Sequence, residues 1–167
     1  YPDRFTNITN GVTPRRWLTQ ANPALSAVID AQIGDGWRAD AGELKALEKH
    51  AHKKTVQTAF GKAKRANKER LAALVRRELG VVIDPASLFD VHIKRIHEYK
   101  RQLLNLLHVV ARYQAIVDHP HADWVPRTVI FAGKAASAYQ TAKAIVNLIH
   151  DVARVINSDP RIGDKFK

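Results

Sequence analysis

The stretch LFDVHIKRIHEYKR, residues 88–101, joins a short apolar run to a dense cluster of charges. Its first six residues, Leu88–Ile93, have the length and the β-branched and aromatic composition of a strand. Its last eight, residues 94–101, hold four fixed cations, one carboxylate, one imidazole and one phenol. A strongly apolar helical pattern follows directly. Such a concentration of cations between a strand and a helix predicts an anion site at the end of the strand.

A second strand is predicted at Thr128–Ala132, and helices are predicted over Gln102–Asp118 and Tyr139–Ile156. Two strands joined by a helical crossover of this length form a parallel pair. The second strand is apolar on both faces, so we expect the sheet to be covered on both sides. The first helix is apolar on most of its circumference and should be buried on more than one side. Residues 88–167 are therefore predicted to be α/β, the start of a partial Rossmann-like parallel sheet.

Residues 1–87 are predicted to form a mainly helical lead to this sheet. Thr13-Pro14 has the residue types of a helix start, and Asn22-Pro23 opens a second helix that ends at Gly34-Asp35-Gly36. A short helix is predicted over residues 42–52 and a long one over 53–79. The apolar residues of the long helix recur every three or four positions and predict one buried stripe. They are Val56, Ala59, Phe60, Ala63, Leu71, Leu74, Val75 and Leu79.

The composition is that of a globular protein, with 46% hydrophobic and 26% charged residues. The chain has no cysteine, which excludes a disulfide scaffold and is compatible with the cytoplasm. No apolar run approaches the ~20 residues that cross a bilayer, and the chain does not open with a signal peptide, so we expect no membrane partner. The eight histidines are scattered, without the spacing of a metal site, and no metal is expected.

A formal net charge of +11 makes nucleic acid a rival partner. The cations are densest along residues 53–77, which favours a basic α/β nucleic-acid- or phosphate-binding module as the alternative interpretation. That helix offers no aromatic stacking platform, and no known nucleic-acid-binding motif is present. The simpler interpretation is a solvated helix face, so we expect no specific nucleic-acid partner. A gel shift at physiological salt distinguishes specific nucleic-acid binding from nonspecific binding, because binding by charge alone weakens as the salt concentration rises.

Gly133 and Lys134 follow the second predicted strand. Neighbouring strands lie roughly 5 Å apart, so these residues and the cluster at 94–101 would face one crevice. A glycine lets the backbone approach a ligand closely, and the start of the next helix supplies N–H donors. The sequence predicts a site for one or more phosphates. Of the other polar groups, His97 is expected to be structural and Glu98 to pair with a neighbouring arginine.

Four blocks carry a resemblance to a known family: TNGVTPRRW at 9–17, SLFD at 87–90, KRIHEYKRQLLN at 94–105 and GKAA at 133–136. In order and spacing they are similar to the α-glucan phosphorylases, the glycogen, starch and maltodextrin phosphorylases, over essentially the whole chain. The resemblance implies half of a GT-B fold, with this chain at the start of the C-terminal Rossmann-like domain. It also implies a cytoplasmic, homodimeric parent enzyme.

The activity implied by the resemblance is transfer of the terminal glucosyl unit of an α-1,4-glucan to orthophosphate, giving α-D-glucose 1-phosphate. The family uses pyridoxal 5′-phosphate, held as a Schiff base by a lysine, and the cofactor's phosphate acts as a proton shuttle. Carried over, Arg95 resembles the arginine that binds substrate phosphate, and Lys100 the lysine that contacts the cofactor phosphate. These two are the expected catalytic residues. Lys94, Arg16 and Trp17 resemble residues of the cofactor pocket.

Asn10 resembles the asparagine that hydrogen-bonds the glucosyl unit. The sequence also departs from the family pattern, since the Gly-Thr-Gly-Asn-Met-Lys motif that contains the cofactor lysine does not occur in it. The family's N-terminal domain has no counterpart either, and the chain stops where an α/β unit would return to a strand. We therefore expect a fragment that is inactive by itself.

Overall fold

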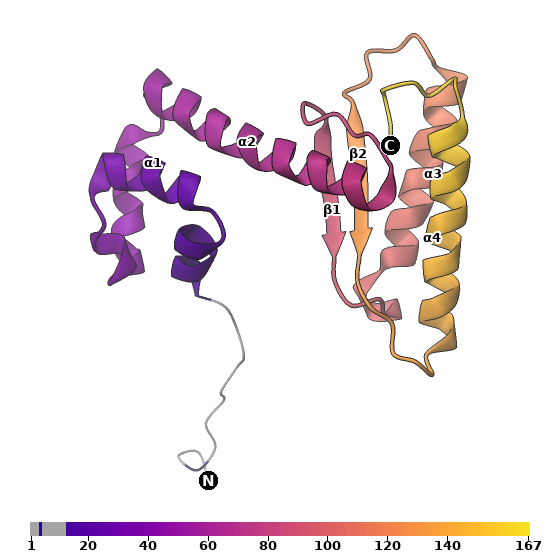
Figure 1. Ribbon diagram of the computed structural model, residues 1–167, viewed down its shortest axis with the longest axis horizontal. Helices are drawn as coiled ribbons and strands as arrows, with labels where there is room; N and C mark the ends of the chain where they lie inside the picture. Colours follow the sequence, from indigo (N-terminus) through magenta and orange to yellow (C-terminus); the bar gives the residue numbers. More distant parts are fainter. Residues whose placement is uncertain (1–3, 5–12) are drawn as a thin grey trace. The chain divides into compact units, whose positions relative to one another are not determined.

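The computed structural model describes residue 4 and residues 13–167 and shows two compact units, Tyr1–Arg70 and Leu71–Lys167 (Figure 1). The boundary between the units falls inside the long helix α2, Lys54–Leu79. The sequence-based division between residues 87 and 88 marks a change from helical to α/β composition and stays a prediction.

The first unit opens with a helical turn after Thr13, whose carbonyl oxygen accepts hydrogen bonds from the backbone N–H groups of residues 16 and 17. A π-helical segment, η2, follows over Arg16–Gln20. Helix α1 spans Pro23–Ile33 as predicted, because the side chain of Asn22 accepts a hydrogen bond from a backbone N–H of the first turn. Gly34 ends the helix at φ 76°, a conformation that favours glycine.

The short helix predicted over 42–52 is instead a 3₁₀-helix, η4, over Ala41–His50, which follows a 3₁₀ turn, η3, at Gly36–Arg38. The side chain of Asp40 accepts a hydrogen bond from the N–H of Gly42, only two residues on, so the chain starts with a tight local turn. Trp37 fills the core of this unit and donates its indole N–H to Asp30.

The predicted buried stripe of α2 is confirmed only in part, since four of its residues are half-buried: Val56, Ala59, Leu71 and Val75. Only Ala63 of the helix is buried, whereas Phe60 and Leu74 are exposed and Leu79 is 71% exposed. The three-and-four spacing does produce an amphipathic helix, but spacing cannot supply the partner that covers the stripe. Gly80, at φ 69°, ends the helix as predicted.

The second unit contains strand β1 over Leu88–Ile93, helix α3 over Gln102–Asp118, strand β2 over Arg127–Ala132 and helix α4 over Gln140–Ser158. The strands pair in parallel along their whole length, first residue opposite first and last opposite last. The predicted α/β class with a helical lead is confirmed. The chain then returns to the sheet, since residues 165–167 exchange backbone hydrogen bonds with the other edge of β2.

Both helices pack on one face of the sheet, where α3 and α4 lie side by side (Figure 1). Their shared core includes Leu106, Ile116, Ile156 and Phe166. The opposite face is partly exposed, with Val91 48% and Ile93 58% exposed but Thr128 of β2 buried. Our expectation of a sheet covered on both faces is therefore wrong for these 167 residues.

The expectation that α3 is buried on more than one side is also wrong, because three of its leucines are exposed. They are Leu103, Leu104 and Leu107. An apolar residue shows that burial would be favourable, but it does not show which segment provides it.

Candidate phosphate site at the ends of the parallel strands

The pairing of β1 and β2 continues past the ends of both strands. The N–H of Lys94 donates to the carbonyl of Ala132 at 3.1 Å, and the N–H of Ile96 donates to the carbonyl of Lys134 at 3.0 Å. The two basic segments therefore run side by side at one edge of the sheet. The order of the strands predicted that the segments are neighbours. A crevice shared by both basic segments stays a prediction, because the depression at the end of β1 is lined by Lys94 and Lys100 and not by Gly133 or Lys134.

Gly133 lies between these two hydrogen bonds, directly against the other segment. A Cβ atom at this position would lie 2.1 Å from the carbonyl oxygen of Lys94 and 3.1 Å from Cδ1 of Ile96. The sequence predicted that a glycine here would let the backbone approach a ligand. In the structure the close approach is to the backbone of the neighbouring segment, so the glycine is required by the pairing itself.

The segment after β2 differs from its prediction. Residues 133–136 form neither a turn nor a regular element, a turn follows at 137–138, and α4 begins at Gln140. The hydrogen bond from Ile96 to Lys134 keeps this segment paired with its neighbour past Gly133. We expected the start of the next helix to supply N–H donors directly after Gly133. Because α4 begins only at Gln140, its N-terminus does not directly follow Gly133.

The cations of this edge carry uncompensated charge. Across residue 4 and residues 13–167, no carboxylate lies within ion-pair distance of Lys94, Arg95, Lys100, Arg101 or Lys134. Lys94 and Lys100 line an open depression of about 540 Å³ at the end of β1. Lys100 also lies over the ring of Tyr99, with Nζ 4.7 Å from the ring centroid. Two unpaired lysines that line an open depression favour anion binding there, whereas Arg95, Arg101 and Lys134 do not line this depression.

His97 and Glu98 support this loop rather than line the depression. His97 Nδ1 accepts a hydrogen bond from the N–H of Tyr99 at 3.3 Å, and its ring contacts those of Tyr99 and Tyr139. The structural interpretation of His97 is confirmed. The carboxylate of Glu98 accepts from the hydroxyl of Tyr139, which raises the pKa of that tyrosine. The predicted arginine pairing of Glu98 is wrong, because Tyr139, just before α4, is the group that lies beside it.

Sequence reasoning missed Gln102, the first residue of α3. Its side chain is completely buried and bonds to the backbone of Arg95 and of His97. The one available signal was a polar residue directly before the apolar pair Leu103-Leu104 at the start of the helix. It also missed Tyr139, which only tertiary structure brings to Glu98.

The remaining candidates belong to the first unit. Arg16 donates from Nε to Gln20 Oε1 at 2.9 Å, and Trp17 is exposed on η2. Asn10 lies outside the described residues. Their predicted roles in cofactor and glucosyl binding stay predictions.

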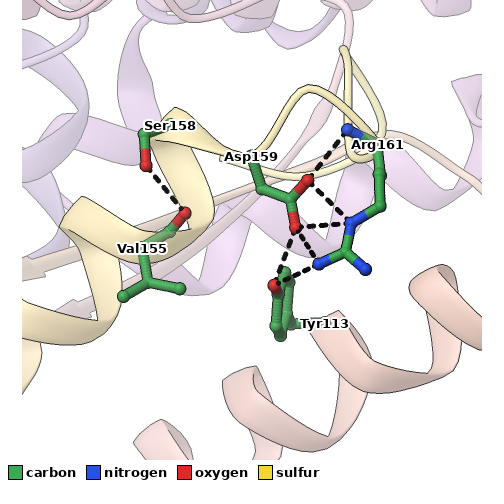
Figure 2. A network of polar contacts seen from close by, with 5 residues as sticks. All are labelled: Tyr113, Val155, Ser158, Asp159 and Arg161. Atoms are coloured by element: carbon green, nitrogen blue, oxygen red, sulfur yellow. Dashed lines mark hydrogen bonds and ion pairs between the residues drawn. The ribbon is translucent and has the colours of Figure 1, made fainter.

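A second polar cluster lies at the C-terminal end of α4, the other end of this helix from Tyr139 (Figure 2). Arg161 donates to Asp159 Oδ2 at 2.6 Å and to the hydroxyl of Tyr113 at 3.1 Å, and that hydroxyl donates to Asp159 at 2.7 Å. These bonds, above all those from Arg161, hold the pKa of Asp159 well below its usual range. The cluster joins the end of α4 to α3 and is structural.

Neither a metal site nor a membrane span is found in the part of the chain that the structure describes. No group of three or more histidine, cysteine or acidic side chains there could hold a metal ion. No helix there is both long enough and apolar enough to span a membrane.

Comparison with known proteins gives one consistent result. The sequence model of the family described as carbohydrate phosphorylase matches residues 1–167. The chain is 53% identical over 167 residues to a glycogen phosphorylase of Pasteurella multocida and 50% identical over 167 residues to one of Synechocystis. It is 45% identical over 166 residues to the brain form of glycogen phosphorylase from Bos taurus. The matches cover 99–100% of this chain but only 20% of each relative, so the chain spans about a fifth of their length.

Proposed function

Because the chain belongs to the carbohydrate phosphorylase family, we propose that it is part of a 1,4-α-glucan phosphorylase and contributes that enzyme's phosphate-binding edge. The longer protein transfers the terminal glucosyl unit of an α-1,4-glucan to orthophosphate, giving α-D-glucose 1-phosphate. It works in the cytoplasm as a homodimer. Glycogen phosphorylases that align with the whole chain support this proposal.

The observation that carries the proposal is the set of unpaired cations where β1 and β2 end. Orthophosphate and a cofactor phosphate held close together repel each other, and fixed positive charge is needed to offset that repulsion. Arg95 binds the substrate phosphate, because a guanidinium presents paired N–H donors to two phosphate oxygens. Lys100 and Lys94 serve the cofactor phosphate as point charges. Lys134 adds positive charge from the neighbouring segment.

The cofactor of this enzyme is pyridoxal 5′-phosphate. The residues fit its phosphate, since Lys94 and Lys100 line one open depression without carboxylate partners in the described part of the chain. When bound, the cofactor supplies a phosphate group that can give a proton to the substrate phosphate and take it back. The roles proposed for Arg16 and Trp17 in cofactor binding, and for Asn10 in binding the glucosyl unit, are supported by the family resemblance alone. The lysine that bonds covalently to the cofactor lies in another part of the longer protein.

The chain's own contribution to the reaction is electrostatic. As the glycosidic bond breaks, negative charge on the attacking phosphate must stay close to the developing positive charge on the sugar. Arg95 holds that phosphate in place, and Lys100 keeps the paired phosphates from repelling each other apart. Both cations are fixed to a loop that is bonded to the sheet, so little reorganisation is needed when substrate arrives.

The test uses the full-length enzyme that carries this segment, with Arg95→Ala and Lys100→Ala. Each is expected to lower kcat/KM for orthophosphate by about 100-fold or more, the usual loss when one charge-stabilising donor is removed. Cofactor absorbance should persist. Lys143→Ala, at an exposed cation on α4, is the matched control and should change little. Near-normal turnover of either site variant would show that the role given to it is wrong.

The 167-residue chain alone should show no phosphorolysis and no absorbance band of covalently bound cofactor. A cofactor band on this chain would contradict the proposal.

A further inference from the structure

Gln102 is a fully buried polar side chain, 0% exposed, at the first position of α3. Burying an amide without hydrogen bonds is unfavourable, so the hydrogen-bond partners of Gln102 show what holds it there. Both ends of the amide bond to the loop that precedes the helix. Nε2 donates to the carbonyl of Arg95 at 3.1 Å, and Oε1 accepts from the N–H of His97 at 3.3 Å.

These two hydrogen bonds hold the loop at the peptide units on both sides of Ile96. The side chain of Ile96 is itself buried, in a cluster with Ala142 and Ile145 of α4. Its N–H is bonded to the carbonyl of Lys134. The backbone around Arg95 is therefore fixed from two directions, by the segment that follows β2 and by the amide of Gln102.

The backbone just before Gln102 supports the same interpretation. Arg101 has φ 61°, the one positive value at a non-glycine residue in the part of the chain that the structure describes. A left-handed conformation is unfavourable at such a residue and persists only where its surroundings impose it. This unfavourable conformation occurs at Arg101, the residue directly before the buried Gln102.

We propose that Gln102 is a positioning residue for Arg95. Its amide fixes the peptide units on both sides of Ile96, and this fixes the origin of the Arg95 side chain relative to the strand ends. Two-point binding of phosphate by a guanidinium tolerates displacement of only about 0.5 Å, so loosening this loop weakens phosphate binding before it affects the glucan. The inference rests on the proposed phosphate role of Arg95.

The test compares variants of the full-length enzyme at one helix position. Gln102→Met keeps the length of the side chain and removes both hydrogen bonds. Gln102→Glu keeps the acceptor for His97 and removes the donor to Arg95. Gln114→Met, at an exposed glutamine of the same helix, is the matched control.

We expect Gln102→Met and Gln102→Glu each to raise the KM for orthophosphate about tenfold, as the loss of about 1.4 kcal/mol of hydrogen bonding would do. The KM for glucan should change less than about twofold, and Gln114→Met should change neither. In an Arg95→Ala background, Gln102→Met should lower the remaining kcat/KM less than about threefold, because coupled residues are not additive. A purely structural role would instead affect both substrates alike and persist in that background.

The outcomes separate this inference from the proposed function. If Arg95→Ala leaves the KM for orthophosphate unchanged, the role of Arg95 is wrong. If Arg95→Ala weakens phosphate binding and neither Gln102 variant does, the positioning role is wrong. If the variants fail to fold, the positioning role of Gln102 is tested by amide hydrogen exchange of the unaltered enzyme. The His97 N–H must then exchange as slowly as that of Ile96, and fast exchange would overturn the inference.

Discussion

Replacing Gly133 by alanine should separate the two segments that form the candidate site. The added Cβ would lie 2.1 Å from the carbonyl oxygen of Lys94, and real Cβ contacts essentially never fall below 3.0 Å. The backbones must move apart by about 1 Å to reach an ordinary contact distance. That movement strains the hydrogen bonds on either side, which Lys94 and Ile96 donate at 3.1 and 3.0 Å. Losing both costs ~1–3 kcal/mol.

Native-state amide exchange of the 167-residue chain measures this cost at the affected bonds. The opening free energies at the Lys94 and Ile96 amides should fall by ~1–3 kcal/mol in Gly133→Ala. Gly61→Ala is the matched control, because Gly61 lies within α2 and a Cβ atom added there would have nothing within 4 Å. That substitution should stabilise the helix by ~0.5–1 kcal/mol and leave the other two amides unchanged.

Gly133→Ala should destabilise its surroundings, whereas Gly61→Ala should stabilise its helix. This difference distinguishes an effect of close packing at Gly133 from a general effect of replacing glycine by alanine. If Gly133→Ala leaves both amides as protected as before, the two segments are not held together as described. The candidate site would then lose its structural basis.

Two further predictions concern stability. The pKa of Asp159 is lowered from its ordinary value of 3.8 by its bonds to Arg161 and Tyr113. These bonds therefore stabilise the fold at pH values above 3.8, and their contribution is progressively lost as the pH falls below 3.8. Urea midpoints should therefore fall between pH 5 and pH 2 by less in Asp159→Asn than in the unaltered chain; an equal fall would exclude this cause. Ile116→Ala, in the core, should cost ~2–5 kcal/mol by urea unfolding, whereas exposed Leu104→Ala should cost little; equal losses would contradict the assigned core.

Elements with their own local signals could be predicted from sequence. Helix α1 begins after Asn22 and ends at Gly34 because cap residues act over one turn. Strand β1 ends at Ile93, where the apolar alternation gives way to charge. The parallel pairing followed from the order of the elements, which leaves few other topologies.

Features that depend on a distant partner could not be predicted. The apolar stripe of α2 and the partly exposed face of the sheet have the same side-chain patterns as buried surfaces. Only the structure shows that some of these side chains are exposed. Within the site, the cations at Lys94, Arg95 and Lys100 could be found because charge is visible in sequence. Gln102 could not, because its role lies in two hydrogen bonds to backbone groups that any residue would offer.

The return of residues 165–167 to the sheet makes β2 an interior strand and leaves β1 at the edge. Among the described residues, no strand pairs with the outer edge of β1 at Val91 and Ile93, whose side chains are exposed. An unpaired edge next to an apolar face is a template for strand pairing between molecules. The 167-residue chain on its own is therefore expected to self-associate through this lateral edge of β1 as its concentration rises.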